Sequence, residues 1–143
     1  TLFRSHEVAH AFAKHGQERM SQGQLQQLGG VAVAMGAVDK DSKTQQVWNT
    51  AFGIGSGLGM LKFSRIHEQE ADRLGLVFML MAGYDGREAA EVWVRMSNLS
   101  KESSNPEILS THPSNASRIN DLRTYLPKAI QHATRYNKEV LEK

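Results

Sequence analysis

The chain contains no cysteine among its 143 residues. This absence excludes disulfide bonds and every zinc site built from cysteine thiolates. The chain also lacks any apolar run of the roughly 18 residues that a membrane-spanning helix needs. Its longest weakly apolar stretch, residues 51–63, is short and carries four glycines. We expect these glycines to allow close packing between helices.

Long runs of one charge are missing as well. The formal net charge is only +2, and the pI near 9.0 reflects a small excess of basic residues. No cluster of lysine and arginine is long enough to indicate nucleic-acid binding, so we expect no nucleic-acid partner. The sequence also begins without methionine, five residues before the first candidate ligand. We interpret it as a fragment that opens within a helix, so a missing signal or anchor says nothing of location.

Strand patterns are nearly absent, and helical periodicity predicts a mainly α fold in a single domain over residues 1–143. We expect a first helix to about residue 21, a second reaching about 35, and a loop over 36–45. A long helix should follow from about 46 to 81, with Gly83 as its stop signal. Asp85 and Glu88 have the spacing of a capping box for a helix to about 99. Two more helices are expected over 113–125 and from Pro127 onward.

The strongest chemical signal is the segment HEVAH at residues 6–10. Two histidines four residues apart lie about 40° apart around a helix, so both imidazoles can reach one ion. Glu7 projects beside them, where it can take a proton from a metal-activated water. Nitrogen ligands with one oxygen ligand and an open position suit Zn²⁺. The pattern therefore predicts a zinc site that includes His6 and His10.

A third ligand must come from elsewhere, because His15 and Gly16 do not fit the extended histidine motif of metzincins. The segment RIHEQEADRLG at residues 65–75 offers carboxylates on a second helix. Glu68 is the better candidate and Glu70 its rival, since the two point about 200° apart around the helix. Asp72 shares a face with Glu68 and can accept the N–H of a ligand histidine. We expect the neighbouring His67 to be exposed or locally bonded.

The later segment STHPSNASRI contains His112 and Arg118. His112 precedes a proline that fixes the start of a helix. Spacing alone favours an ordinary helix residue for His112 and a surface salt bridge for Arg118. Their functional alternatives are an oxyanion donor or a ligand at the open zinc position for His112, and a carboxylate partner near the site for Arg118.

Taken in order, HEVAH, SRIHEQEADRLGL about 60 residues later and STHPSNASRI closely resemble metallopeptidase family 48. That family includes the HtpX-like, BepA- and LoiP-like, Oma-like and CAAX prenyl proteases. The resemblance spans residues 1–126, and the soluble bacterial members are nearest in pattern. It implies a zincin-type (gluzincin) helical core, with the family's upstream strand and helix absent from this chain.

The resemblance also assigns residues and a function. It implies one Zn²⁺ per chain held by His6, His10 and Glu68, with Glu7 as general base and Asp72 behind the ligands. It implies an active-site role for His112 and does not decide between the two alternatives for Arg118. It implies a zinc endopeptidase that cleaves unfolded or misassembled polypeptides in protein quality control. The alternative function is a non-catalytic, metal-binding or chaperone-like helical module.

Location and partners rest on the same resemblance. It implies a periplasmic or outer-membrane-associated protein with polypeptide substrates. Partners in or near the outer membrane are compatible with it. So is a companion chain that supplies the missing N-terminal part.

Overall fold

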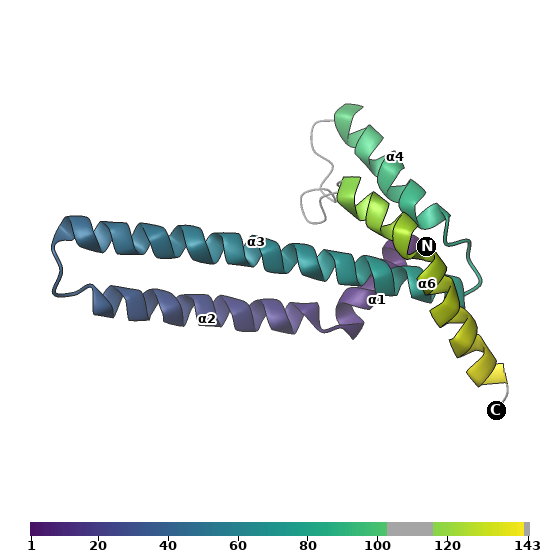
Figure 1. Cartoon of the computed structure of the whole chain (residues 1–143), viewed down its shortest axis with the longest axis horizontal. Helices are drawn as coiled ribbons and strands as arrows, with labels where there is room; N and C mark the ends of the chain where they lie inside the picture. Colours follow the sequence, from purple (N-terminus) through teal and green to yellow (C-terminus); the bar gives the residue numbers. More distant parts are fainter. Residues whose placement is uncertain (103–115, 142–143) are drawn as a thin grey trace. The chain divides into compact units, whose positions relative to one another are not determined.

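The computed structural model describes residues 1–102 and 116–141, and all regular structure in these ranges is helical. The mainly α fold that the sequence predicted is confirmed. Figure 1 shows the helices in chain order; their bounds are α1 Leu2–Phe12, α2 His15–Gly36, α3 Ser42–Met81, α4 Glu88–Glu102 and α6 Ala116–Leu141. None of these helices is long and apolar enough to cross a membrane.

The chain divides into two compact units. The first comprises residues 1–13 and 68–143, and the second comprises residues 14–67. Helix α3 contributes to both, because its first part belongs to the second unit and its last part, from Glu68, to the first. The candidate site residues that the structure describes all fall in the first unit, which is therefore the part of the fold that builds the site.

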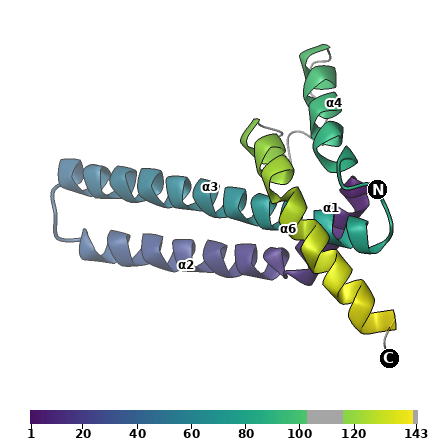
Figure 2. The ribbon, with the colours of Figure 1, turned by 45° about the vertical axis from the view of Figure 1, so that its right-hand side comes forward.

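The core of the first unit lies among α1, the end of α3, α4 and α6. Helix α4 packs against α6 and against α1, and Figure 2 shows α4, α6 and the end of α3 from a second direction. Trp93 is 1% exposed and lies in the core. The buried cluster consists of Leu2, Leu76, Met79, Ala89, Ala90, Trp93, Leu122 and Ala129.

The expected first helix to residue 21 is wrong, because the chain breaks at Ala13–Lys14. Lys14 adopts a left-handed backbone conformation with φ of 59°. Such a conformation costs roughly 1–2 kcal/mol in a residue with a Cβ. It leaves Ala9 buried in one unit and His15 buried in the other. No glycine or proline occupies positions 13 or 14 to indicate the break.

Helix α3 starts at Ser42, about four residues earlier than expected, because Asp41 caps it. The Asp41 carboxylate accepts hydrogen bonds from the backbone N–H groups of Lys43 and Thr44, each at 3.1 Å, and from the Thr44 hydroxyl at 2.6 Å. These bonds satisfy two donors that a helix start otherwise leaves unpaired. They also lower the pKa of Asp41.

The far end of α3 confirms the predicted stop at Gly83, which has a φ of +81°. The N–H of Gly83 bonds to the carbonyl of Leu80, and the N–H of Tyr84 bonds to that of Met79. This pair of bonds is the Schellman motif, which requires a left-handed residue and so favours glycine.

The predicted capping box that follows Gly83 forms in part. Asp85 accepts the N–H of Arg87 at 2.9 Å. The Glu88 carboxylate accepts a hydrogen bond from Arg95, seven residues along the chain. Asp85 thus acts at the start of α4, while Glu88 serves a side-chain pair on the helix surface.

Two other expectations about helices are wrong. The predicted pair of C-terminal helices is replaced, from Ala116 on, by the single helix α6, with Pro127 inside it. Buried Leu122 and Ala129 lie on either side of Pro127, so both halves keep one packed face, while the proline itself is exposed. Close packing at the four glycines of residues 51–63 is also wrong. A Cβ at any of them would have no described neighbour within 4 Å.

Candidate metal centre

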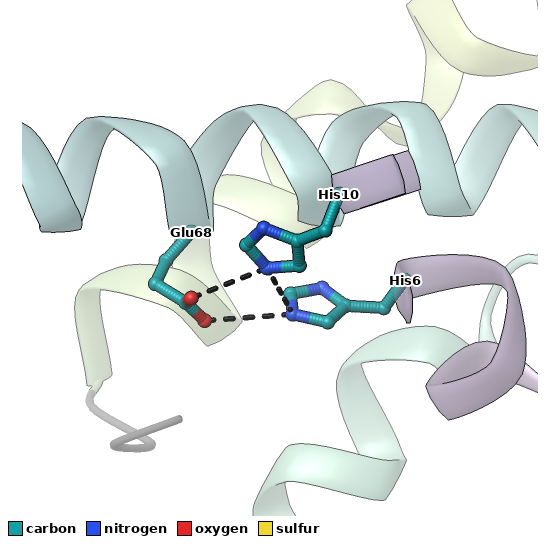
Figure 3. Close-up of side chains that lie close together, drawn as sticks. All are labelled: His6, His10 and Glu68. Atoms are coloured by element: carbon teal, nitrogen blue, oxygen red, sulfur yellow. Dashed lines mark hydrogen bonds and ion pairs between the residues drawn. The ribbon is translucent and has the colours of Figure 1, made fainter. Parts of the chain in front are cut away.

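Three side chains from two helices converge in the first unit (Figure 3). His6 and His10 come from α1, one turn apart, and Glu68 comes from α3. The two Nε2 atoms lie 3.1 Å apart. The Glu68 carboxylate reaches both rings, at 3.4 Å from Nε2 of His6 and 3.2 Å from Nε2 of His10. The i, i+4 spacing in HEVAH thus places both imidazoles at one point in space.

The donor set fits a zinc ion. One ligand atom from each of the three residues lies within 4.8 Å of the others. Bonds of about 2.0–2.1 Å in a tetrahedral arrangement place ligand atoms roughly 3.3–3.4 Å apart, close to the separations observed here. Two imidazole nitrogens and one carboxylate oxygen are also the ligand types of catalytic zinc sites with an open fourth position.

Close contact between helices places His6 at this point. His6 is fully buried. A Cβ on Gly75 would lie 3.0 Å from the backbone nitrogen of His6 and 3.1 Å from its Cα. Only a residue without a side chain allows α1 and α3 to approach so closely. Sequence reasoning missed Gly75, although a lone glycine in a helical pattern indicates such an approach.

Asp72 lies behind His6, on the side of the ring away from Glu68. The Asp72 Oδ1 is 3.0 Å from Nδ1 of His6, and Asp72 is 1% exposed. A carboxylate in this position favours the imidazole tautomer that carries its proton on Nδ1, which leaves the Nε2 lone pair toward Glu68 and His10. Asp72 is thus placed to orient the ring.

The electrostatics of the site depend on these carboxylates. Burial would lower the pKa of His6, but the hydrogen bonds with Asp72 and Glu68 and their negative charges outweigh it, so the pKa lies above 6.5. The two carboxylates therefore favour positive charge at this point, either a proton or a metal ion. This preference agrees with the chemistry of the ligand set.

Arg118 balances the negative charge. Its guanidinium donates to Asp72 from Nε at 2.6 Å and from Nη2 at 2.8 Å, and its Nη1 lies 3.0 Å from Oε2 of Glu68. Arg118 is only 6% exposed, so it does not form the surface salt bridge that spacing alone favoured. It lies over the ring of Trp93, with 4.0 Å between the Arg118 Cζ and the ring centroid. The rings of Trp93 and His6 pack against each other in a T-shaped arrangement.

The other predicted residues lie as follows. Glu7 is exposed on α1, next to His6. Glu70 is exposed on α3, whereas Glu68 is buried, as expected for two residues on opposite sides of one helix. His112 lies outside the described residues, so its two functional readings stay predictions.

His67 was expected to be exposed or locally bonded, and this expectation is wrong. It is 7% exposed and bonds through Nε2 to the carboxylate of Glu18, 49 residues away, at 2.8 Å. Its ring also stacks on His15, with centroids 4.1 Å apart. All three residues belong to the second unit, so His67 packs there although its neighbour Glu68 belongs to the site.

Known proteins have sequences similar to that of this chain. The mitochondrial metalloendopeptidase OMA1 of Saccharomyces cerevisiae is 34% identical over 134 residues, which cover 87% of this chain and 35% of the relative. The beta-barrel assembly-enhancing protease of Escherichia coli strain K12 is 29% identical over 127 residues, covering 83% of this chain and 25% of the relative. The chain thus spans about a third or less of the length of these relatives. No solved structure matches it.

Comparison with a sequence model of a whole protein family also supports this similarity to peptidases. The sequence model of peptidase family M48 matches residues 5–126, which include the whole HEVAH segment, Glu68 and Arg118. This range is most of the chain and agrees with the resemblance that the three sequence segments indicated. The chain belongs to peptidase family M48.

Proposed function

We propose that this chain is the catalytic part of a zinc-dependent endopeptidase that hydrolyses peptide bonds of polypeptides. The observation that supports it best is the convergence of His6, His10 and Glu68 within 3.1–3.4 Å of one another. The membership in family M48 and the names of two relatives, a metalloendopeptidase and a protease, support the same reaction.

In this proposal His6, His10 and Glu68 hold one Zn²⁺. A zinc ion in such a site lowers the pKa of water and polarises a carbonyl group. Glu7 is the general base: its exposed carboxylate accepts a proton from the attacking water and delivers it to the leaving amine. Its place on α1, directly after a ligand, keeps it close to the site.

Asp72 and Arg118 act through the ligands. Asp72 holds the imidazole of His6 in one tautomer and orientation. Arg118 fixes Asp72 by two hydrogen bonds and contacts Glu68, so it sets the distance between the α3 carboxylates and His6. Because the buried Arg118 pairs with both buried carboxylates, it compensates their desolvation and they compensate that of Arg118. We assign Arg118 as a positioning residue.

The substrates, partners and location belong to the same proposal. We infer that unfolded or misassembled polypeptides are cleaved, with a role in protein quality control. Likeness to the beta-barrel assembly-enhancing protease supports a periplasmic or outer-membrane-associated location, whereas likeness to a mitochondrial metalloendopeptidase supports a mitochondrial one. Membrane-associated partners, and a companion chain that supplies further N-terminal structure, remain part of the hypothesis.

One experiment tests the function against its rival, the non-catalytic helical module. The purified protein is assayed for zinc content and for cleavage of unfolded casein, with and without a chelator. We expect about one zinc per chain and cleavage that stops on chelation and returns when zinc is restored. A protein that binds casein with zinc present but leaves every peptide bond intact would support the chaperone-like module instead.

A further inference from the structure

The second unit, residues 14–67, has hardly any apolar core. Helix α2 and the first part of α3 run side by side in opposite directions in both ribbon views (Figures 1 and 2). Among its residues, only Ala37 is a buried hydrophobic one, whereas eleven of the residues described in the first unit are. A helix needs to bury its apolar stripe against another element. Within residues 1–102 and 116–141, no element covers these apolar side chains of the hairpin.

These side chains are large and numerous. Twelve of the 18 large hydrophobic residues that the structure exposes belong to this unit, and each is 51–71% exposed. They are Met20, Leu25, Leu28, Val31, Met35, Val38, Val47, Trp48, Ile54, Leu58, Leu61 and Ile66. Single exposed hydrophobic residues are ordinary, but a concentration of this kind marks an interaction site.

Their spacing is that of helices that pack on other helices. Exposed apolar residues of α3 follow each other at steps of four, three, four and three: Val47, Ala51, Ile54, Leu58 and Leu61. On α2, Leu28, Val31 and Met35 are separated by steps of three and four. Alternating steps of three and four give the apolar seam of a helical bundle or coiled coil. The face that these residues form therefore suits helical partners.

The charge pattern of the hairpin suits a second copy of the chain as its partner. Residues 20–38 and 44–61 contain no Asp, Glu, Lys or Arg, and the charges lie at the tip, on Asp39, Lys40, Asp41 and Lys43, and at the base of the hairpin. When a surface meets its own copy around a two-fold axis, like charges come together. Here no such repulsion arises along residues 20–38 and 44–61, because these stretches of α2 and α3 carry no charge.

We propose that this hairpin is a homodimer interface, in which it packs against the same hairpin of a second copy to form a four-helix bundle. Two such hairpins supply the four apolar stripes that a bundle buries. A stable interface takes about 20–30 residues on each side, and the hairpin offers its twelve large exposed side chains together with the smaller exposed residues between them. The glycines Gly53, Gly55, Gly57 and Gly59 have open space at their Cβ positions, so a partner helix can approach closely.

A lipid surface fits the hairpin less well. Helices that lie in a membrane interface carry lysine and arginine along their polar face. The uncharged stretches of α2 and α3 have none, and their polar residues are mainly glutamine, serine, threonine and asparagine. The binding partner that suits this surface better is therefore a second copy of the chain.

The test measures the oligomeric state of the purified protein by sedimentation velocity over a range of concentrations. We expect a concentration-dependent dimer in the wild type and a monomer in Leu58→Glu, which places two like charges in the buried seam. The matched control is Tyr136→Glu, which changes a side chain on α6 that is 50% exposed and outside the hairpin. This control should remain a dimer. Circular dichroism verifies that each variant keeps its helices.

A second measurement tests the proposal even if Leu58→Glu fails to fold. Because the chain has no cysteine, Ile54→Cys and Tyr136→Cys each introduce a single thiol. Alkylation at dimer-forming concentration should be slow at position 54 and fast at position 136. The proposal is overturned if the wild type stays monomeric at every concentration. It is also overturned if the thiol at position 54 reacts as fast as that at position 136, or if a monomer binds anionic lipid vesicles through the hairpin.

Discussion

Arg118 donates two hydrogen bonds to Asp72, a residue 46 positions earlier in the chain, with both side chains buried. The same guanidinium contacts Glu68, and Asp72 contacts His6. One cation of α6 thus lies between two carboxylates of α3, one of which orients a candidate ligand of α1. This relationship leads to predictions for the metal, the base and the groups behind them.

The first prediction concerns the ligand set. Glu68→Gln removes an anionic ligand, so zinc affinity should fall strongly, whereas Glu70→Gln on the exposed side of α3 should leave it unchanged. Elemental analysis and competition with a chromogenic chelator measure both variants. Equal zinc loss in the two would contradict the assignment of Glu68.

The second prediction concerns Glu7, which we assign to proton transfer. Glu7→Gln should keep zinc but lower the rate of peptide cleavage by about 10²–10⁴, the usual contribution of a general base. The measurement is kcat/KM on a fluorogenic peptide, with zinc content determined on the same sample. A variant with full zinc and wild-type activity would show that another group takes the proton.

The third prediction concerns the contact between Asp72 and His6. Asp72→Asn keeps the size of the side chain but removes its charge, so the imidazole loses its anionic acceptor. Zinc affinity or activity should fall by about 10–100-fold, less than on loss of a ligand. Unchanged zinc affinity and rate in Asp72→Asn would mean that the tautomer of His6 is fixed by another contact.

The fourth prediction concerns Arg118. Arg118→Lys keeps the positive charge, but a lysine ammonium cannot contact both oxygens of Asp72 and also Oε2 of Glu68 in the same geometry. We expect lower zinc affinity while the folded state persists. Arg87 offers a matched control, because it also bonds to both oxygens of one carboxylate, that of Asp85, but is exposed. If Arg118→Lys and Arg87→Lys behave alike in zinc titration, Arg118 has no positioning role.

The fifth prediction concerns Gly75. A Cβ at this position would press on the backbone of His6, so Gly75→Ala should destabilise the fold by roughly 1–3 kcal/mol and weaken zinc binding. In Gly23→Ala, a Cβ within α2 meets nothing within 4 Å, and stability should stay equal or rise by up to about 1 kcal/mol. Thermal unfolding of both variants, with zinc titration, measures the difference. A tolerated Gly75→Ala would refute the role of close contact.

The sequence by itself determined the features that depend on neighbouring residues. The i, i+4 spacing of His6 and His10 follows from the helix period alone. The stop at Gly83 requires only a residue that tolerates a positive φ, and the side-chain cap by Asp85 needs only a short acidic residue before a helix. The opposite directions of Glu68 and Glu70 also follow from helical geometry. These features needed no knowledge of distant contacts.

The tertiary structure alone decided the features that depend on distant parts of the chain. Lys14 takes a left-handed conformation where no local signal indicates a break, and the buried residues on both sides of Pro127 keep α6 in one piece. Only packing brings Arg118 to Asp72 and Gly75 to His6. The physical reason is that burial of apolar and charged groups outweighs local backbone preferences, and which groups are buried together is set by the fold.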